Sequence, residues 1–293
     1  MKHSVFEGVF PYLVSPVNQD GSVKESVLAD LVHHLIDCGV HGLTPLGSTG
    51  EFAYLTAEQR KEVVRVVVEA ANHRVPVVAG VCHTSTAEAC RQARVNESLG
   101  VEGILAIMDT YFPVNQDQVF SYFRAIADAV QCPVVIYNNP TFSRFDLSVE
   151  LIERLTDVPN IRYLKDASGK TGKLLTIMNR LGSRIRLFSA SANVPLFVMM
   201  LGGVGWMAGP ACIIPKQSVK LYELARQKRW DEAMELQKSL WEVNRVFQKY
   251  SLAACIKAGL ALQGFPVGDP VPPLTPLNEA SLQEVREILS TLE

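Results

Sequence analysis

Short apolar runs alternate with longer amphipathic stretches along most of this chain. The short runs are rich in the β-branched and aromatic residues that favour strands. They are almost continuously apolar, which is typical of parallel strands whose two faces are both buried. Runs of this kind predict eight strands, at residues 9–14, 42–46, 75–79, 103–107, 134–137, 162–165, 185–188 and 204–207.

The stretches between the predicted strands have the spacing of amphipathic helices. In residues 57–70, the valines at positions 63, 64, 67 and 68 fall on one stripe. Thr56 and Gln59 form a capping-box pattern at the start of this helix. Similar spacing predicts helices at residues 87–99, 116–130 and 147–155. Strands that alternate with helices indicate the α/β class, and eight such units predict a (β/α)8 TIM barrel.

Further amphipathic stretches follow the last predicted strand. They predict helices at residues 217–227, 231–250, 252–263 and 278–292, with a proline-rich loop at 266–276. The last three helices exceed what an eight-stranded barrel requires. We therefore expect a barrel over residues 1–228 and a C-terminal helical extension over residues 229–293 that is part of the same structural unit.

The composition indicates a globular protein of the cytoplasm. The 293 residues are 48% hydrophobic and 20% charged, which is enough apolar material for a large core. A net charge of -2 gives no electrostatic reason to expect nucleic acid or an anionic membrane as a partner. The longest apolar run, near residues 194–200, is too short to span a bilayer. Residues 1–8 carry no apolar segment of a secretory signal, so we expect a cytoplasmic protein.

Neither a disulfide framework nor a metal site is expected. The cysteines contain no Cys-x-x-Cys pair, which favours free thiols in a reduced interior; they are Cys38, Cys82, Cys90, Cys132, Cys212 and Cys255. No group of His, Cys and Asp residues has the spacing of metal ligands. The glycines at positions 203, 205 and 209 lack the downstream acid of a dinucleotide-binding loop. We therefore expect no metal and no cofactor.

Residues capable of chemistry follow several of the predicted strands. The glycine turn at residues 47–50 ends the second strand, Tyr111 follows the fourth, Tyr137 ends the fifth and Lys165 ends the sixth. Active sites of (β/α)8 barrels lie at the carboxyl ends of the strands. We therefore expect an amine, two phenols and a hydroxyl-rich turn at one mouth of the barrel.

Lys165 is the most informative of these residues. Alternation along its strand places it inward or at the rim of the barrel. A lysine that loses its water favours the neutral amine, which is a nucleophile toward ketones and forms an imine. The alternatives are a salt bridge to Asp166 or a lysine at the rim in contact with solvent, and the spacing alone does not decide between them.

The glycine turn and the tyrosines also have two interpretations each. The turn can bind a small carboxylate through its amides and through the hydroxyls of Ser48 and Thr49, or it can be an ordinary turn with local caps. Tyr111 and Tyr137 can transfer protons, or they can be packed aromatics with satisfied hydroxyls. His83 can contact substrate or make a local structural hydrogen bond.

Three motifs in order resemble those of one superfamily. They are Gly-Ser-Thr-Gly-Glu at residues 47–51, Tyr-Asn-Asn-Pro at 137–140 and Leu-Lys-Asp-Ala-Ser-Gly at 164–169. Together they resemble the dihydrodipicolinate synthase and N-acetylneuraminate lyase superfamily of pyruvate-dependent class I aldolases, over nearly the whole chain from Gly8. The resemblance implies a (β/α)8 barrel with a C-terminal helical region, a Schiff-base lysine and no cofactor.

The resemblance also implies a role for each residue at a matching position. Lys165 matches the lysine that attacks the keto carbon of pyruvate. Tyr137 matches the tyrosine that passes protons during imine formation and bond making or breaking, and Thr49 matches the hydroxyl that relays protons to it. Ser48 and Thr49, next to Gly47, match the pair that holds the pyruvyl carboxylate.

Further positions are implied at the edge of the site. Tyr111 matches the tyrosine that, in the synthase branch, reaches into the site of a neighbouring subunit. Gly205 and Met207 match backbone of the eighth strand that lines the pocket. The family usually forms tetramers, so we expect a homotetramer that binds pyruvate or another small keto acid.

The chain departs from both reference branches where the second substrate is bound. The synthase branch has an arginine for the carboxylate of its aldehyde, and here that position is Phe142, with Arg144 two residues further on. The sialic-acid lyase branch has acidic residues in the loop after strand seven, and residues 189–193 here contain no acid. We expect a second substrate unlike that of either branch.

Several functions remain open. The first is a lyase or aldolase that makes or cleaves a carbon–carbon bond between pyruvate and an aldehyde. The second is a dehydratase of a 2-keto-3-deoxy sugar acid that uses the same lysine imine. The third is a non-catalytic member that binds a keto acid. The retention of Lys165, Tyr137 and Thr49 argues against the third.

Overall fold

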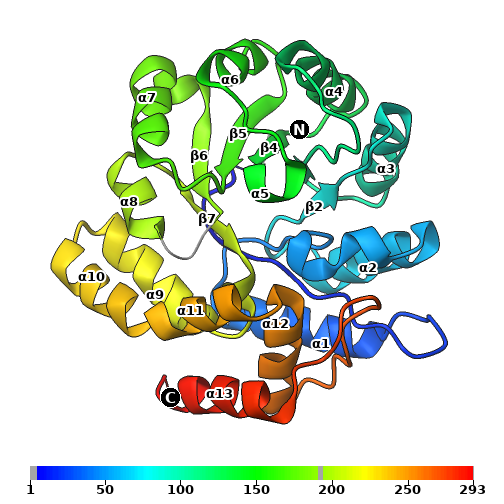
Figure 1. Cartoon of the computed structure of the whole chain (residues 1–293), viewed down its shortest axis with the longest axis vertical. Helices are drawn as coiled ribbons and strands as arrows, with labels where there is room; N and C mark the ends of the chain where they lie inside the picture. The colour runs from blue at the N-terminus through cyan, green and yellow to red at the C-terminus, as the bar shows by residue number, and fades with distance from the viewer. Residues whose placement is uncertain (1–4, 191–193, 293) are drawn as a thin grey trace. The chain divides into compact units, whose positions relative to one another are not determined.

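The computed structural model describes residues 5–190 and 194–292 of the chain (Figure 1). The chain divides into two compact units. The first unit comprises Met1–Glu7 and Val78–Met207, and the second comprises Gly8–Val77 and Ala208–Glu293. The expected boundary at residue 228 stays a prediction.

The first unit is built on parallel strands that neighbour one another in chain order. The order is β2, β3, β4, β5, β6 and β7, and every pair is parallel. The strands are β2 (Val78–Val81), β3 (Gly103–Ala106), β4 (Val134–Asn138), β5 (Ile161–Asp166), β6 (Arg186–Ser189) and β7 (Gly205–Ala208), which ends at the unit boundary. Nearly all of their residues are buried, as expected for a parallel sheet with both faces covered.

Helices connect and cover these strands. They are α3 (Thr86–Ser98), α4 (Gln116–Asp128), α5 (Pro140–Ser143), α6 (Val149–Leu155), α7 (Thr171–Leu181), the 3₁₀ turn η3 (Gly182–Arg184) and α8 (Pro195–Met200). In Figure 1, α3, α4, α6 and α7 form an arc outside the strands of this unit. The crossovers through helices leave the carboxyl ends of the parallel strands together at one edge.

The second unit contains β1 and the remaining helices. Its elements are β1 (Gly8–Pro11), α1 (Glu25–Asp37), the 3₁₀ turns η1 (Ser48–Gly50) and η2 (Phe52–Tyr54), α2 (Ala57–Ala71), the 3₁₀ turn η4 (Gly209–Cys212), α9 (Pro215–Arg226), α10 (Trp230–Ser239), α11 (Trp241–Lys249), α12 (Leu252–Leu262) and α13 (Glu279–Ser290). The predicted capping box starts α2, because Gln59 N–H donates to Thr56 Oγ1 at 3.1 Å and Thr56 N–H donates to Gln59 Oε1 at 2.8 Å.

The prediction of a strand at residues 42–46 was wrong. This segment makes only isolated parallel bridges, Leu43 with Val77 and Thr44 with Tyr12. Pro45 has no N–H to donate to a ladder, and Leu46 has a φ of 58° in the left-handed region. The chain therefore leaves the extended conformation after two paired residues.

The prediction of one continuous helix at residues 231–250 was also wrong. Leu240 separates α10 from α11, although no glycine or proline marks the break. The two helices have different partners: α10 packs on α9, whereas α11 packs on α12 and α13. Tertiary packing thus ends the first helix where the local sequence does not.

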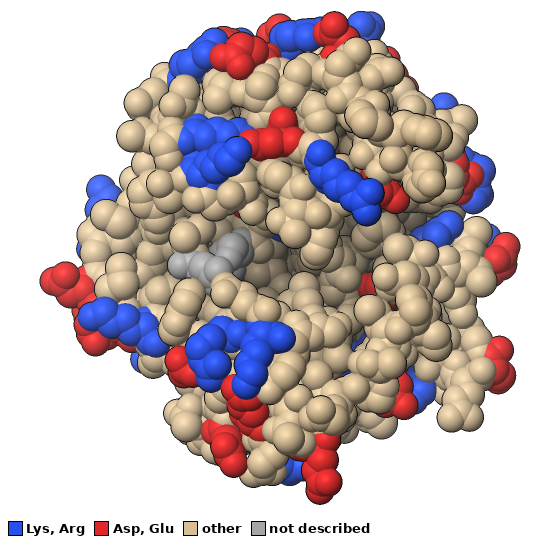
Figure 2. Space-filling view, viewed as in Figure 1, with Lys and Arg blue, Asp and Glu red and all other residues tan. Residues whose placement is uncertain are grey.

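Apolar and charged residues separate as expected for a folded protein. The apolar run near residue 197 forms α8, in which Leu196, Val198 and Met199 are buried. No helix within the described ranges has both the length and the hydropathy needed to cross a membrane. Figure 2 shows lysines and arginines beside acidic residues on the viewed face. Ion pairs of the described residues include those of Arg180 with Glu153 and of Arg245 with Glu284.

Candidate active site

Lys165 and Tyr137 lie side by side in the first unit. They are register partners on the neighbouring strands β5 and β4. Lys165 is 1% exposed, and its Nζ lies 3.6 Å from the centroid of the Tyr137 ring. The structure therefore brings together two of the residues that the sequence predicted for catalysis.

The environment of Lys165 favours the neutral amine. Burial penalises the charged ammonium and holds the pKa of Lys165 well below its usual range. A position at a solvent-exposed rim, one of the alternatives from the sequence, is excluded by this burial. The other alternative was a salt bridge to Asp166, whose carboxylate oxygens accept hydrogen bonds from Asn138 and Ser168. An amine that is neutral near pH 7 can attack a carbonyl carbon.

The hydroxyl of Tyr137 is oriented by the residue two positions later. Asn139 Nδ2 donates to Tyr137 Oη at 2.8 Å. Asn139 also begins α5, where its Oδ1 accepts the N–H of Phe142 at 3.3 Å. No role for Asn139 was predicted from the sequence, although an asparagine directly before a proline is a typical helix N-cap.

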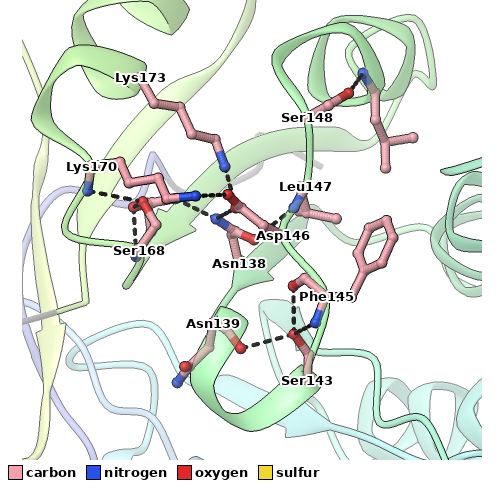
Figure 3. Close-up of polar contacts among 12 residues, drawn as sticks. Asn138, Asn139, Ser143, Phe145, Asp146, Leu147, Ser148, Ser168, Lys170 and Lys173 are labelled. Atoms are coloured by element: carbon pink, nitrogen blue, oxygen red, sulfur yellow. Dashed lines mark hydrogen bonds and ion pairs between the residues drawn. The ribbon is translucent and has the colours of Figure 1, made fainter. Parts of the chain in front are cut away.

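Asn138 joins the ends of two strands to the loop that follows α5 (Figure 3). Its Nδ2 donates to Asp166 Oδ2 at 2.7 Å and to Asp146 Oδ1 at 2.9 Å, and its Oδ1 accepts the N–H of Leu147 at 3.0 Å. Both amide hydrogens and the carbonyl of this buried side chain are therefore bound. Because Asn138 and Asp166 directly follow Tyr137 and Lys165, these bonds hold the two catalytic candidates in register.

Asp146 extends this network to helix α7. Its carboxylate pairs with Lys173 and, at 2.8 Å, with Lys170 (Figure 3). Burial raises the pKa of Asp146, but hydrogen bonds from Lys170, Lys173 and Asn138 outweigh burial, so the pKa lies below its usual value. The sequence pattern did not predict this network, since its members come from a strand end, a loop and the start of a helix.

The segment expected to contact the second substrate, residues 142–144, is held by hydrogen bonds of Ser143. Phe142, on α5, is 55% exposed, and Arg144 is exposed with a φ of 56°. The Ser143 hydroxyl lies 2.8 Å from the carbonyl oxygens of both Asn139 and Phe145 (Figure 3). Thr110 Oγ1 donates to the Ser143 carbonyl at 3.1 Å. The exposed side chain at position 142 is thus an apolar ring with no hydrogen-bond donor.

The other predicted residues of the first unit lie in different settings. Tyr111 is 82% exposed and contacts Phe112 edge to face, with ring centroids 5.0 Å apart. Gly205 and Met207 are buried in β7. Ser189 and Ala190 of the acid-free loop are described, whereas residues 191–193 lie outside the described residues.

His83 makes a local hydrogen bond. Its Nδ1 accepts the N–H of Ser85 at 2.9 Å, just before α3 begins. The backbone N–H of His83 donates to Tyr122 Oη at 3.4 Å. Of the two interpretations from the sequence, the structural one is therefore observed.

The predicted carboxylate-binding turn belongs to the second unit. Ser48 and Thr49 lie in the 3₁₀ turn η1, directly after Gly47. A Cβ at Gly47 would lie 2.4 Å from the ring of Tyr12, so only glycine fits there. Thr49 is fully buried, and within the described part of the chain its Oγ1 has no hydrogen-bond partner. A buried hydroxyl of this kind is a candidate for binding a ligand.

The burial of Lys165 predicts a pH-dependent effect on stability. Burial lowers the pKa of Lys165 in the folded chain, whereas in the unfolded chain the lysine binds a proton below a pKa of roughly 10.4. Between the folded and unfolded pKa values, the free energy of unfolding of the native chain should rise by about 1.4 kcal/mol per pH unit relative to Lys165→Met. Lys165→Met should therefore be the more stable protein near pH 7, and its advantage should disappear above about pH 10.

Urea unfolding at pH 7, 8 and 9 and at one protein concentration measures this difference. Lys61→Met, which replaces an exposed lysine of α2, controls for the loss of a positive charge. An advantage of Lys165→Met that stays constant with pH would contradict a neutral Lys165.

The comparisons with known proteins agree over the whole chain. The Dihydrodipicolinate synthetase family matches residues 5–292. A 4-hydroxy-tetrahydrodipicolinate synthase of Phenylobacterium zucineum is 34% identical over 281 residues, which cover 96% of this chain and 95% of the relative. A synthase of the same name from Methanosphaerula palustris is 33% identical and covers 99% of this chain and 100% of the relative.

Solved structures are similar along their full length. A chain from Pseudomonas aeruginosa has a TM-score of 0.96 at 31% identity and covers 99% of this chain and 100% of that chain. YagE, a prophage protein of E. coli K12 in the dihydrodipicolinic acid synthase family, was solved in complex with pyruvate. It has a TM-score of 0.93 at 28% identity and covers 99% of each chain. The predicted fold class is confirmed, and the chain belongs to the dihydrodipicolinate synthetase family as a lyase with a (β/α)8 barrel and a C-terminal helical region.

Proposed function

We propose that Lys165 forms an imine with the keto carbon of pyruvate, and that the enzyme makes or cleaves a carbon–carbon bond between pyruvate and an aldehyde. The observation that carries this proposal is the buried amine of Lys165, with its lowered pKa, beside the ring of Tyr137. The family membership and the relative solved with pyruvate support the same keto acid.

The chemistry follows from a neutral amine and a nearby phenol. The lone pair of Lys165 Nζ attacks the keto carbon, and loss of water gives a protonated imine after proton transfers for which Tyr137 is the proposed group. In the cleavage direction, the hydroxyl of the substrate loses its proton and the carbon–carbon bond breaks. Its electron pair moves into the imine to give an enamine, and the aldehyde leaves. Protonation and hydrolysis then release pyruvate and the free amine.

The carboxylate of the keto acid needs its own donors. We propose Gly47, Ser48 and Thr49 for this task, with Thr49 also relaying protons. The family resemblance and the buried Thr49 hydroxyl, which has no partner in the described part of the chain, support this assignment. Gly205 and Met207 are proposed to line the pocket. We propose that the protein is a homotetramer of the cytoplasm. The exposed rings of Tyr111 and Phe112 support an oligomer in which another subunit covers these two rings.

The second substrate is proposed to lack a carboxylate at the position of Phe142. A carboxylate is best held by the bidentate donors of an arginine, and an aromatic ring provides no donor. Phe142 is partly exposed and can contact an apolar or weakly polar aldehyde instead. This distinguishes the proposed reaction from that of a dihydrodipicolinate synthase, whose aldehyde, aspartate semialdehyde, carries a carboxylate.

Trapping the imine tests the proposed chemistry. Incubation with pyruvate and borohydride should add one reduced pyruvyl group to the peptide that contains Lys165. Lys165→Met should lose this label, whereas Lys61→Met should keep it. Label on a different lysine, or label that persists in Lys165→Met, would contradict the role of Lys165.

Product analysis separates the two catalytic alternatives. With a panel of 2-keto-3-deoxy acids, an aldolase releases pyruvate and an aldehyde, whereas a dehydratase retains the full carbon chain. Absence of both the imine and turnover would leave the non-catalytic, keto-acid-binding alternative.

Removal of the Tyr137 hydroxyl tests proton transfer. Tyr137→Phe keeps the ring against Lys165, so the fold should survive while kcat falls by about 10²–10⁴-fold. Tyr163→Phe is the matched control, because Tyr163 is a buried tyrosine on β5 whose hydroxyl accepts the N–H of Phe6 and has no proposed part in catalysis. Near-normal turnover by Tyr137→Phe would assign the protons to another group.

The specificity proposal is tested at Phe142. The native enzyme should turn over pyruvate with aspartate semialdehyde poorly, and Phe142→Arg should raise kcat/KM for this aldehyde about tenfold or more, since a charged hydrogen bond contributes about 1.5–3 kcal/mol. Phe142→Leu, which adds no donor, is the control. Efficient turnover of aspartate semialdehyde by the native chain would return the protein to the synthase branch.

A further inference from the structure

Glu51 is a residue of the first motif that the proposed chemistry does not use. It follows the turn of residues 47–50 directly and has a φ of 55°, an uncommon conformation for a residue with a side chain. Its side chain is 0% exposed. A buried carboxylate beside a ligand-binding turn needs partners that offset its lost hydration.

The partners of Glu51 come from the C-terminal helical region. Its Oε2 lies 2.6 Å from Nζ of Lys257, on helix α12, and its Oε1 accepts the N–H of Val271 at 2.7 Å. Lys257 Nζ also donates to the carbonyl of Asp269 at 2.8 Å. The Lys257 side chain is 1% exposed. One buried ion pair therefore joins the turn, α12 and the proline-rich loop within the second unit.

The charges of this pair depend on each other. Burial lowers the pKa of Lys257, and the Glu51 carboxylate opposes that shift. Removal of one member leaves an uncompensated buried charge, which is strongly destabilising. Removal of both charges, in contrast, is often close to neutral for stability.

The turn itself is packed closely on the same elements. A Cβ at Gly209, in η4, would lie 2.6 Å from Thr49 Oγ1 and 2.5 Å from Cδ1 of Ile256, on α12. Thr49 thus packs against η4, which in turn contacts α12, and Glu51 binds α12 directly through Lys257. A shift of the turn by even a few tenths of an ångström would change these contacts.

We propose that Glu51 and Lys257 are positioning residues, whose buried ion pair sets the place of the Ser48–Thr49 turn that binds the keto-acid carboxylate. This inference rests on the proposed function of that turn. It assigns a role in substrate binding to the C-terminal helical region, since α12 supplies the cation and the loop after α12 supplies Val271 and Asp269.

The experiment compares the single variants Glu51→Gln and Lys257→Met with the double variant. Two properties are measured on the full-length protein: the thermal midpoint, and the pyruvate concentration that gives half-maximal borohydride labelling of Lys165. Both single variants should lose thermal stability and need at least tenfold more pyruvate. The double variant should recover most of the thermal stability and still need at least tenfold more pyruvate, with labelling at saturating pyruvate close to native.

A second pair provides the matched control. Glu235→Gln with Lys238→Met removes an exposed ion pair of α10, in which the side chains are 73% and 64% exposed. This variant should match the native chain in both measurements, because exposed pairs contribute little.

Other results for the double variant would contradict the positioning role of the ion pair. A double variant with native stability and native pyruvate dependence would show that the ion pair is dispensable for binding. A double variant that does not fold would show a structural role only. Both outcomes overturn the inference. Failure of the native chain to form the Lys165 imine would instead refute the proposed function. Borohydride labelling of the native chain alone measures this, so the two failures can be distinguished.

Discussion

The removal of water from the Lys165 amine is the constraint on which the rest of the candidate site depends. An exposed lysine is protonated near pH 7 and has no lone pair for a carbonyl carbon. Within β5 the amine is buried, and its pKa falls because the ammonium ion is poorly solvated there. A parallel sheet covered on both faces provides such a position, and the register of β4 places Tyr137 next to it. The hydrogen bonds of Asn138 then hold the ends of the two strands together.

The sequence was sufficient to find Lys165 and Tyr137, because both occupy strand ends in a repeated pattern of strands and helices. It was not sufficient to find Asn138, Asp146 and Lys173 as one network. These residues come from a strand end, a loop and a helix, and no periodic pattern in the sequence indicates that they are in contact. The distinction is physical: alternation along a strand fixes which face a residue occupies, whereas a polar network depends on the tertiary packing of several elements.

The same distinction holds for the fold. Strands β1 to β7 were predicted from their apolar runs, and the start of α2 from its capping box, since these signals are local. The apolar residues at 42–46 predict a strand, but Pro45 has no N–H for a ladder and Leu46 adopts a left-handed φ that the local sequence does not indicate. The break at Leu240 could not be predicted, because the sequence there contains no helix breaker and the partners of α10 and α11 are distant in sequence.

The bonds of Glu51 also determine when this part of the protein can fold during its synthesis. The ribosome completes the glycine turn early, but Val271, which binds Glu51, is added 220 residues later. Lys257 and Asp269 are likewise made long after Glu51. A nascent chain that already contains Lys165 and Tyr137 therefore still lacks the cation that neutralises Glu51. A segment that is made much later completes the surroundings of the first motif, so this part of the enzyme cannot reach its final structure until Val271 has been made.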